Sequence, residues 1–242
     1  MNKIKEYIKK IDTKTKIITI ISVIIVVIIL TLMLVLTRRN KQVSEDDIYG
    51  VFPSEVRQIY SNLVNISCSG DLYFDIELDG DEIDVNNINK IDLLNYIFSY
   101  LDKKDFLKNK FSVDVLKDAA NRLFLDNIDV LVNFTNFNYG KYTYTLKNNQ
   151  IIRTSNECIS NNNYVSYLYG YSWSDDILKI DVNIGYLKDG ILYDFDDNEL
   201  GEYDGDKSKL ANLMKNVSYY RMTYIKDNGV YKFKSIKWMN RV

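Results

Sequence analysis

The acidic side chains that could bind a metal ion gather in the last quarter of the chain. The longest run is Asp194, Asp196, Asp197, Asn198, Glu199, Glu202, Asp204 and Asp206. An EF-hand loop beginning at Asp194 would need glycine at its sixth position and glutamate at its twelfth, where this chain has Glu199 and Gly205. We therefore interpret the run as a solvated turn between strands, with a calcium site of another kind as the alternative. The same interpretation applies to Asp79, Asp81, Glu82 and Asp84.

Catalysis through histidine is excluded because the chain contains none. Schemes that pair a serine or cysteine nucleophile with histidine therefore do not apply. The sequence also lacks a phosphate-binding glycine loop, a GxSxG turn and an HExxH motif. Two cysteines without histidine do not supply the ligands that zinc or copper needs. We expect no catalytic residue, no metal and no cofactor, and an enzyme acting through carboxylates or lysine is the alternative.

Aromatic side chains in a predicted strand over residues 164–173 are the candidates for ligand binding. Tyr167, Tyr169 and Trp173 occupy alternate positions there. Stacked tyrosine and tryptophan rings can line a pocket or bind the face of a sugar. The alternative is packing, because aromatic residues favour strands and half of a half-buried strand faces the core.

Cys68 and Cys158 are the only thiols in the chain. In an oxidising exterior such a pair can form a disulfide. In the chain-entropy model, closing a loop of roughly 90 residues would stabilise the fold by at most about 4–5 kcal/mol. The alternative is that both are small apolar residues without a covalent partner.

The segment that would decide where in the cell these groups lie is the apolar stretch of residues 17–36, which begins at Ile17 and ends at Leu36. Seventeen of its twenty residues are apolar and none is charged. As a helix it would be about 30 Å long, the thickness of the hydrocarbon core of a bilayer. A cleaved signal peptide is the alternative, but its apolar core is usually only about 7–15 residues long, and no small-residue cleavage site follows Leu36. We therefore predict an uncleaved transmembrane helix, with the lipid bilayer as its partner.

The distribution of charge predicts the orientation of this segment. Residues 1–16 carry six lysines, whereas only Arg38, Arg39 and Lys41 follow the span closely. The excess predicts a cytoplasmic basic tail over residues 1–16, a stalk over residues 37–53 and an extracytoplasmic domain over residues 54–242. Residues 1–41 carry a net charge of +7 and the remainder −9. An acidic outer domain argues against nucleic-acid binding.

Apolar residues at helical spacing predict helices in the first half of this domain. They cover residues 54–67, 91–101 and 112–124, the last capped by Ser112. Alternation of apolar and polar residues predicts a half-buried strand over residues 71–78.

From residue 128 onward, alternation and turn pairs predict mainly strands. The predicted strands cover residues 128–135, 139–146, 150–155, 164–173, 176–187 and 190–195. A short helix over residues 207–215 precedes a closing hairpin that turns at Asp227-Asn228-Gly229. In the last strand the large apolar residues stand at odd positions at Tyr231 and Phe233 but at even positions at Ile236 and Trp238. This shift of one residue in the alternation predicts a β-bulge. Helices followed by a bent antiparallel sheet indicate the α+β class.

This layout and the closing aromatic pattern of Tyr231, Phe233, Ile236 and Trp238 resemble the NTF2-like and cystatin-like folds over residues 54–242. The resemblance implies helices packed on a curved antiparallel sheet, although the helix at residues 207–215 departs from the simplest NTF2-like order. With its anchor, the helix at residues 60–65 (YSNLVN) before the first cysteine and its closing aromatic strand, the chain is also similar to uncharacterised single-pass membrane proteins of low-GC Gram-positive gut bacteria, of Firmicutes or Mollicutes type. Its organisation resembles the VirB8-like components of secretion systems, and none of these resemblances implies an activity.

Together these observations predict a membrane-anchored extracytoplasmic protein that acts as a non-catalytic scaffold or protein-interaction module at the cell surface. Its partner would be another protein or a second copy close to the membrane, because a stalk of some 16 residues reaches at most about 55 Å. The alternative is a domain that binds cell-wall glycan or a small ligand through Tyr167, Tyr169 and Trp173.

Overall fold

The computed structural model describes residues 51–64, 71–76, 80–126, 128–129, 134–155 and 163–240. The predicted span at residues 17–36, most of the predicted stalk, Cys68 and Cys158 lie outside these ranges. The chain divides into two compact units, Met1–Ser44 and Glu45–Val242, and every described residue belongs to the second. No helix among the described residues is both long and apolar enough to span a bilayer.

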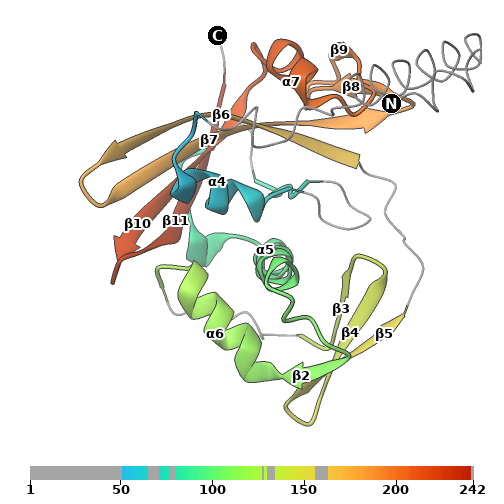
Figure 1. The fold of residues 1–242 in the computed structure, drawn as a ribbon, viewed down its shortest axis with the longest axis vertical. Helices are drawn as coiled ribbons and strands as arrows, with labels where there is room; N and C mark the ends of the chain where they lie inside the picture. Colours follow the sequence, from blue (N-terminus) through green and yellow to red (C-terminus); the bar gives the residue numbers. More distant parts are fainter. Residues whose placement is uncertain are drawn as a thin grey trace, which may run out of the picture. The chain divides into compact units, whose positions relative to one another are not determined.

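The described part of the chain has the α+β architecture that its periodicities predict, with helices packed on a curved antiparallel sheet (Figure 1). Its four α-helices are α4 (Ser54–Ser61), α5 (Lys90–Lys103), α6 (Val113–Leu123) and α7 (Lys207–Leu213), and a 3-10 turn, η1 (Val85–Asn87), precedes α5. The predicted cap of α6 is confirmed, because the Ser112 side chain accepts a hydrogen bond from the Asp114 N–H. Asn89 caps α5 in the same way.

The larger sheet has the order β1-β11-β10-β7-β8-β9, and β6 also pairs with β7. Because β6 pairs with the same stretch of β7 as β10 and β8 do, it lies along the opposite edge of β7. The strands of this sheet are β1 (Ile83–Asp84), β6 (Asn163–Ser174), β7 (Ile177–Lys188), β8 (Ile191–Tyr193), β9 (Glu199–Glu202), β10 (Tyr219–Asp227) and β11 (Val230–Met239).

A smaller antiparallel sheet has the order β2-β5-β4-β3. Its strands are β2 (Lys110–Ser112), β3 (Asn136–Tyr139), β4 (Tyr142–Lys147) and β5 (Gln150–Ser155). The turn between β4 and β5 consists of Asn148 and Asn149, which both have positive φ. This confirms the predicted turn, because asparagine adopts the left-handed region more readily than most residues.

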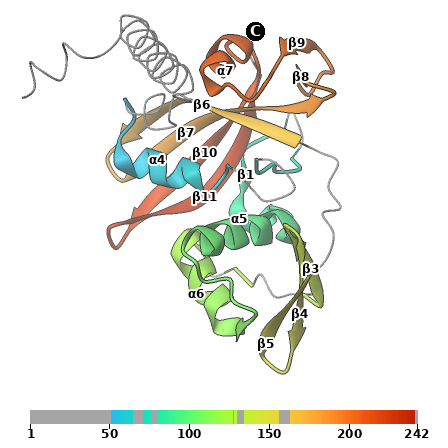
Figure 2. The ribbon, with the colours of Figure 1, turned by 45° about the vertical axis from the view of Figure 1, so that its right-hand side comes forward.

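Helices α4 and α5 lie on one face of the larger sheet and α7 on the other (Figures 1 and 2). The Tyr60 hydroxyl of α4 donates to the Ser166 carbonyl oxygen of β6 at 3.0 Å. The main core fills the space between this face, the helices and the smaller sheet. A second, smaller cluster on the α7 side consists of Leu192, Tyr203, Leu210, Met214 and Val217.

A cluster of aromatic rings joins α5, α6 and the extended residues 71–76 to the closing hairpin. Its members are at most 1% exposed, and they are Phe74, Tyr96, Phe124, Tyr224 and Phe233. The centroid of the Phe233 ring lies between 5.4 and 6.4 Å from those of the other four. These separations are typical of favourable ring pairs, so Phe233 is the centre of the main core.

Strand β7 changes its partner from β10 to β8 at Gly185. It pairs with β10 as far as Asn183 and with β8 from Tyr186 onward. A Cβ atom at Gly185 would lie 2.5 Å from the Tyr193 carbonyl oxygen. Only glycine therefore lets the backbone of β8 approach β7 so closely.

The bulge predicted in the last strand is confirmed. Thr223 pairs with Ser235 and Tyr224 with Phe233, so Lys234 has no residue directly opposite it in β10. The extra residue directs the Lys234 ammonium group to the Asp84 carboxylate, with 2.8 Å between nitrogen and oxygen. A bulge of this kind re-aims a side chain while it bends the strand.

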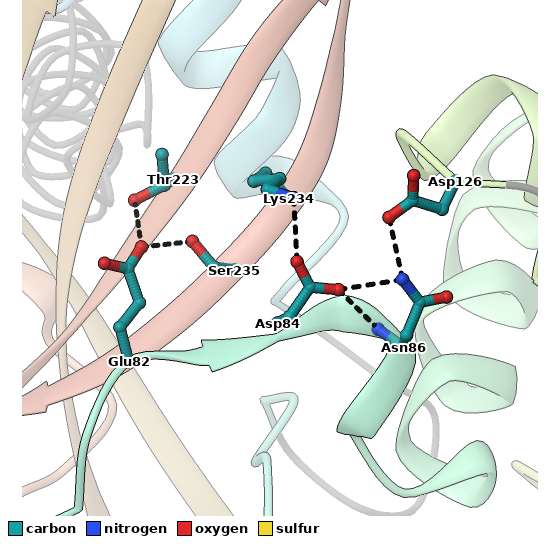
Figure 3. A network of polar contacts seen from close by, with 7 residues as sticks. All are labelled: Glu82, Asp84, Asn86, Asp126, Thr223, Lys234 and Ser235. Atoms are coloured by element: carbon teal, nitrogen blue, oxygen red, sulfur yellow. Dashed lines mark hydrogen bonds and ion pairs between the residues drawn. The ribbon is translucent and has the colours of Figure 1, made fainter.

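The short strand β1 is held to this hairpin by acidic side chains (Figure 3). Glu82 accepts hydrogen bonds from the hydroxyls of Thr223 and Ser235, which face each other just before the bulge. Asn86 donates to Asp84 and, at 2.7 Å, to Asp126 beyond α6. The carboxylates of Glu82 and Asp84 therefore serve in packing β1 and η1 against the sheet.

Several predicted elements differ from the structure. The described residues of the strand predicted over 128–135, which are 128, 129, 134 and 135, belong to no strand. Residues 71–76 are extended and bury Leu72, Phe74 and Ile76, but they pair with neither sheet, so the predicted strand over 71–78 is wrong in that part. The predicted strand over 139–146 contains a hairpin turn at Gly140 and Lys141, and β3 lies before it. The predicted helix over 54–67 ends at Ser61.

Asp92, in the first turn of α5, fixes the extended segment to that helix. Its carboxylate accepts a hydrogen bond from the Asp75 N–H at 3.1 Å. The pKa of Asp92 is raised from 3.8 to about 6, mainly by burial and in part by the nearby Asp75 carboxylate, against the lowering effect of this hydrogen bond. The charged form is therefore disfavoured in the fold.

We predict that Asp92→Asn stabilises the protein at neutral pH and flattens its pH dependence. Between the unfolded pKa of 3.8 and the folded pKa of about 6, the folded state binds the extra proton, so raising the pH lowers the stability of the wild type. The full effect is at most about 3 kcal/mol, since one pKa unit is worth about 1.4 kcal/mol. Urea unfolding curves at several pH values measure it, and a constant difference between variant and wild type across this window would contradict the prediction.

Candidate functional site

The predicted ligand-binding residues lie on β6, whose register on β7 shifts at Tyr169. Leu168 and Gly170 pair with the adjacent residues Val182 and Asp181, so Tyr169 is an extra residue. Beyond such a bulge the alternation of side chains between the two faces is reversed. The aromatic residues before and after it therefore point to opposite sides of the sheet.

The bulge separates Trp173 from Tyr167 and Tyr169. The Tyr169 ring lies 5.5 Å from that of Tyr219, and Tyr167 packs partly buried near the cluster under α7. Trp173 pairs with Leu178, whose side chain is buried in the main core, and so lies on the other face. The three residues do not form one surface, which corrects the prediction that treats them as a single row.

Trp173 belongs instead to a row of rings that we call the hairpin aromatic patch, made of Phe52, Tyr171, Trp173 and Tyr231. Successive ring centroids along this row are 5.8, 5.4 and 6.4 Å apart. Tyr171 and Trp173 are 40% and 42% exposed. The patch gathers residues from the start of α4, from β6 and from β11, which sequence periodicity within one element does not connect.

A cavity of about 630 Å³ lies on the other side of the β10–β11 turn, and we call it the hairpin groove. The end of α5, the following loop, α6 and the hairpin line it. Its apolar lining includes Leu101, Phe106, Val115 and Val230, of which Phe106 and Val230 are exposed. Its charged lining residues are Asp118, Arg122, Asp227 and Lys232, and the last two form an ion pair at 2.7 Å.

The groove continues toward α4 and runs beside an open strand edge. A smaller cavity of about 190 Å³ shares Tyr100, Arg122 and Val230 with it. Strand β1 pairs with β11 only at Ser235 and Ile236. Among the described residues, no strand pairs with the outer edge of β11 from Val230 to Lys232. An apolar groove beside an open edge can accept an extended polypeptide.

A third cavity, of about 660 Å³, has aromatic walls near the far end of β7. Tyr73 stacks on Tyr164 at 4.9 Å and on Phe195 at 5.0 Å, and the rings of Tyr164 and Phe195 lie 6.2 Å from each other. The Tyr186 hydroxyl donates to the Asp197 carboxylate, and this hydrogen bond raises the pKa of Tyr186 to about 12. The rings here stack mainly on one another, which leaves less ring surface for a ligand.

Two titratable groups with shifted pKa values were missed by sequence reasoning, the buried Asp92 and Lys103, which is exposed overall. Burial lowers the pKa of Lys103 to about 8, and its ammonium group donates to the Val64 carbonyl oxygen at 2.8 Å. Shifted values of this kind are frequent in active sites. The two residues lie 11 positions apart on α5, which separates them by about 16 Å along the helix axis. They therefore do not form an acid–base pair.

The acidic run that begins at Asp194 organises a turn. The Asp194 carboxylate accepts hydrogen bonds from the backbone N–H groups of Asp196 and Asn198 at 2.9 and 2.8 Å. This is an Asx-type turn between β8 and β9, as the sequence interpretation expects. Among the described residues, no group of three or more acidic or cysteine side chains is arranged to hold a metal ion.

No protein-family model, curated protein or solved structure matches this chain.

The two tryptophans provide a test of this arrangement. Trp238 is 6% exposed and its ring lies 4.9 Å from that of Tyr220, whereas Trp173 is 42% exposed. We predict that Trp238→Ala lowers the free energy of unfolding by about 3–5 kcal/mol, and Trp173→Ala by about 1 kcal/mol or less. Urea unfolding followed by far-ultraviolet circular dichroism measures both. Equal losses would show that the hairpin aromatic patch is part of the core.

Proposed function

We propose that this chain is a membrane-anchored extracytoplasmic protein whose outer domain is a non-catalytic protein-interaction module. The observation that carries the proposal is the hairpin groove, which combines an apolar floor with the open edge of β11. Its occupant would be an extended apolar segment of another protein or of a second copy of this chain.

The geometry of the groove suits such a segment. An extended segment could pair with β11 beside residues 230–232, next to Phe233, whose carbonyl oxygen accepts the Leu125 N–H, while its apolar side chains would fill the space between Phe106 and Val115. Asp118 and Arg122 line the same cavity from α6 and would contact polar residues of the partner. Main-chain bonds of this kind give affinity, and the side-chain pockets give specificity.

The proposed location rests on the sequence. The apolar segment from Ile17 to Leu36 would be the transmembrane helix, with residues 1–16 in the cytoplasm and residues 54–242 outside. The same proposal includes a relation to the NTF2-like and cystatin-like folds and to the VirB8-like organisation. A curved sheet wrapped on helices and a long closing hairpin support it, whereas the smaller sheet is an addition to that layout.

Binding of a glycan or small ligand is the weaker candidate. Its predicted residues Tyr167, Tyr169 and Trp173 are divided between two faces of the sheet. The aromatic cavity around Tyr73 offers rings that already stack on one another.

Photo-crosslinking in intact cells tests the protein-interaction role. We predict that a photoreactive residue in place of Val230 gives a crosslinked product of defined mass with one protein, because this side chain is exposed at the groove. The same residue in place of Lys147, which is exposed at the end of β4 in the smaller sheet, is the matched control. Equal labelling from both positions, or no product from Val230, would count against the proposal.

Proteolysis of intact cells tests the orientation. An exposed outer domain would be degraded by added protease while residues 1–36 remain with the membrane. The bilayer would protect only the span and the cytoplasmic tail of residues 1–16. Detection of an epitope at each end of the chain measures this. An outer domain that resists protease until the cells are opened would contradict the proposed topology.

A further inference from the structure

The hairpin aromatic patch is exposed although it consists of large rings. Tyr171 and Trp173 each expose about two fifths of their surface, and the adjoining Val51 is 83% exposed. The Lys226 ammonium group lies 5.7 Å from the centre of the Tyr231 ring at the edge of the patch. Rings with an apolar body and a polar tip are the residue types that favour the boundary between water and lipid.

The patch lies where the outer domain begins. Phe52 is itself a member, and Val51 is the first described residue. Only 14 residues separate Leu36, the last residue of the proposed span, from Val51. Fully extended, this connection measures about 50 Å. A surface at the start of the domain can therefore reach the bilayer with little extension of the connecting chain.

We propose that the hairpin aromatic patch rests on the interfacial region of the bilayer that holds the anchor, so that the domain docks on lipid through Phe52, Tyr171, Trp173 and Tyr231. This inference rests on the proposed membrane anchoring but not on the proposed protein partner. The contact is additional to the transmembrane segment and fixes which side of the domain faces the membrane.

Lipid suits the patch better than a second copy does. Stable protein interfaces bury about 1,200 Å² or more, whereas two rings that are about two fifths exposed, Tyr171 and Trp173, and two partly buried ones, Phe52 and Tyr231, offer at most a few hundred Å². A tethered surface needs less area, because the tether raises its local concentration at the membrane to the order of millimolar. Small apolar surfaces of this kind bind reversibly and are useful when they are already held near their target.

The charges around the patch indicate which lipid it would take. Lys226 lies near the Glu55 carboxylate, whose pKa is lowered mainly by a backbone hydrogen bond and the Ser54 hydroxyl and to a smaller extent by the Lys226 charge. Asp175 and Asp176 form the β6–β7 turn beside Trp173. The edge of the patch is therefore neutral to slightly acidic, which favours zwitterionic lipid over an anionic headgroup.

Tryptophan quenching in the full-length chain tests the inference. Trp173 and Trp238 are the only tryptophans, so Trp238→Phe leaves Trp173 as the single reporter and Trp173→Phe leaves Trp238. We expect lipids brominated near the headgroup to remove about half of the Trp173 fluorescence in reconstituted zwitterionic bilayers, and almost none from Trp238. Replacing about a third of the lipid with an anionic one should leave this loss unchanged or reduce it.

A second pair of variants distinguishes docking from mere proximity. In the Trp238→Phe background, Tyr231→Ser removes a neighbouring ring of the patch and should reduce the quenching of Trp173 by about twofold or more. Tyr142→Ser, a partly buried tyrosine of the smaller sheet, is the matched control and should leave it unchanged.

The outcomes separate this inference from the proposed anchoring. If alkaline carbonate extracts the chain from the bilayer, the anchoring fails and the inference with it. If the chain stays in the bilayer but brominated lipid does not quench Trp173, the inference is overturned and the anchoring stands. Shielding of Trp173 from aqueous acrylamide that rises with protein density, without quenching by brominated lipid, would assign the patch to a second copy instead.

Discussion

The packing of the Phe233 ring is the interaction on which the rest of the described domain depends. This side chain contacts rings from the extended segment, from α5, from the end of α6 and from β10. Each buried ring removes a large apolar area from water, and together they join helices and sheet that are far apart in the sequence. A backbone hydrogen bond from the Leu125 N–H to the Phe233 carbonyl oxygen, at 3.1 Å, joins the end of α6 to the hairpin beside this cluster.

The elements with local signals could be predicted from the sequence. α5 and α6 follow from a helical period, and the bulge at Lys234 follows from the phase slip between Phe233 and Ile236. The extended residues 71–76 show the alternation of a strand, but strand pairing depends on distant residues, and here the segment packs between α5 and the larger sheet without forming a strand of either sheet.

The candidate surfaces were harder to foresee, for a similar reason. The spacing of the aromatic residues in β6 predicts that they share one face of the strand. A single extra residue at Tyr169 places Trp173 on the face opposite to that of Tyr167. Phe52 and Tyr231 then join Trp173 from elements far away in the chain. The turn between β10 and β11 shapes both surfaces, because Val230 lines the groove while Tyr231 ends the patch. A partner in the groove would therefore be bound beside whatever the patch contacts.

The exchange of partners along β7 divides the described domain into two packing units. Beyond Gly185 the chain builds β8, β9 and α7, which pack on their own small cluster. Proteins open locally in contiguous units whose limits follow such breaks in packing. We therefore expect the segment from β8 to α7 to open as a cooperative unit of its own and to exchange its amide hydrogens while the ring cluster around Phe233 stays closed.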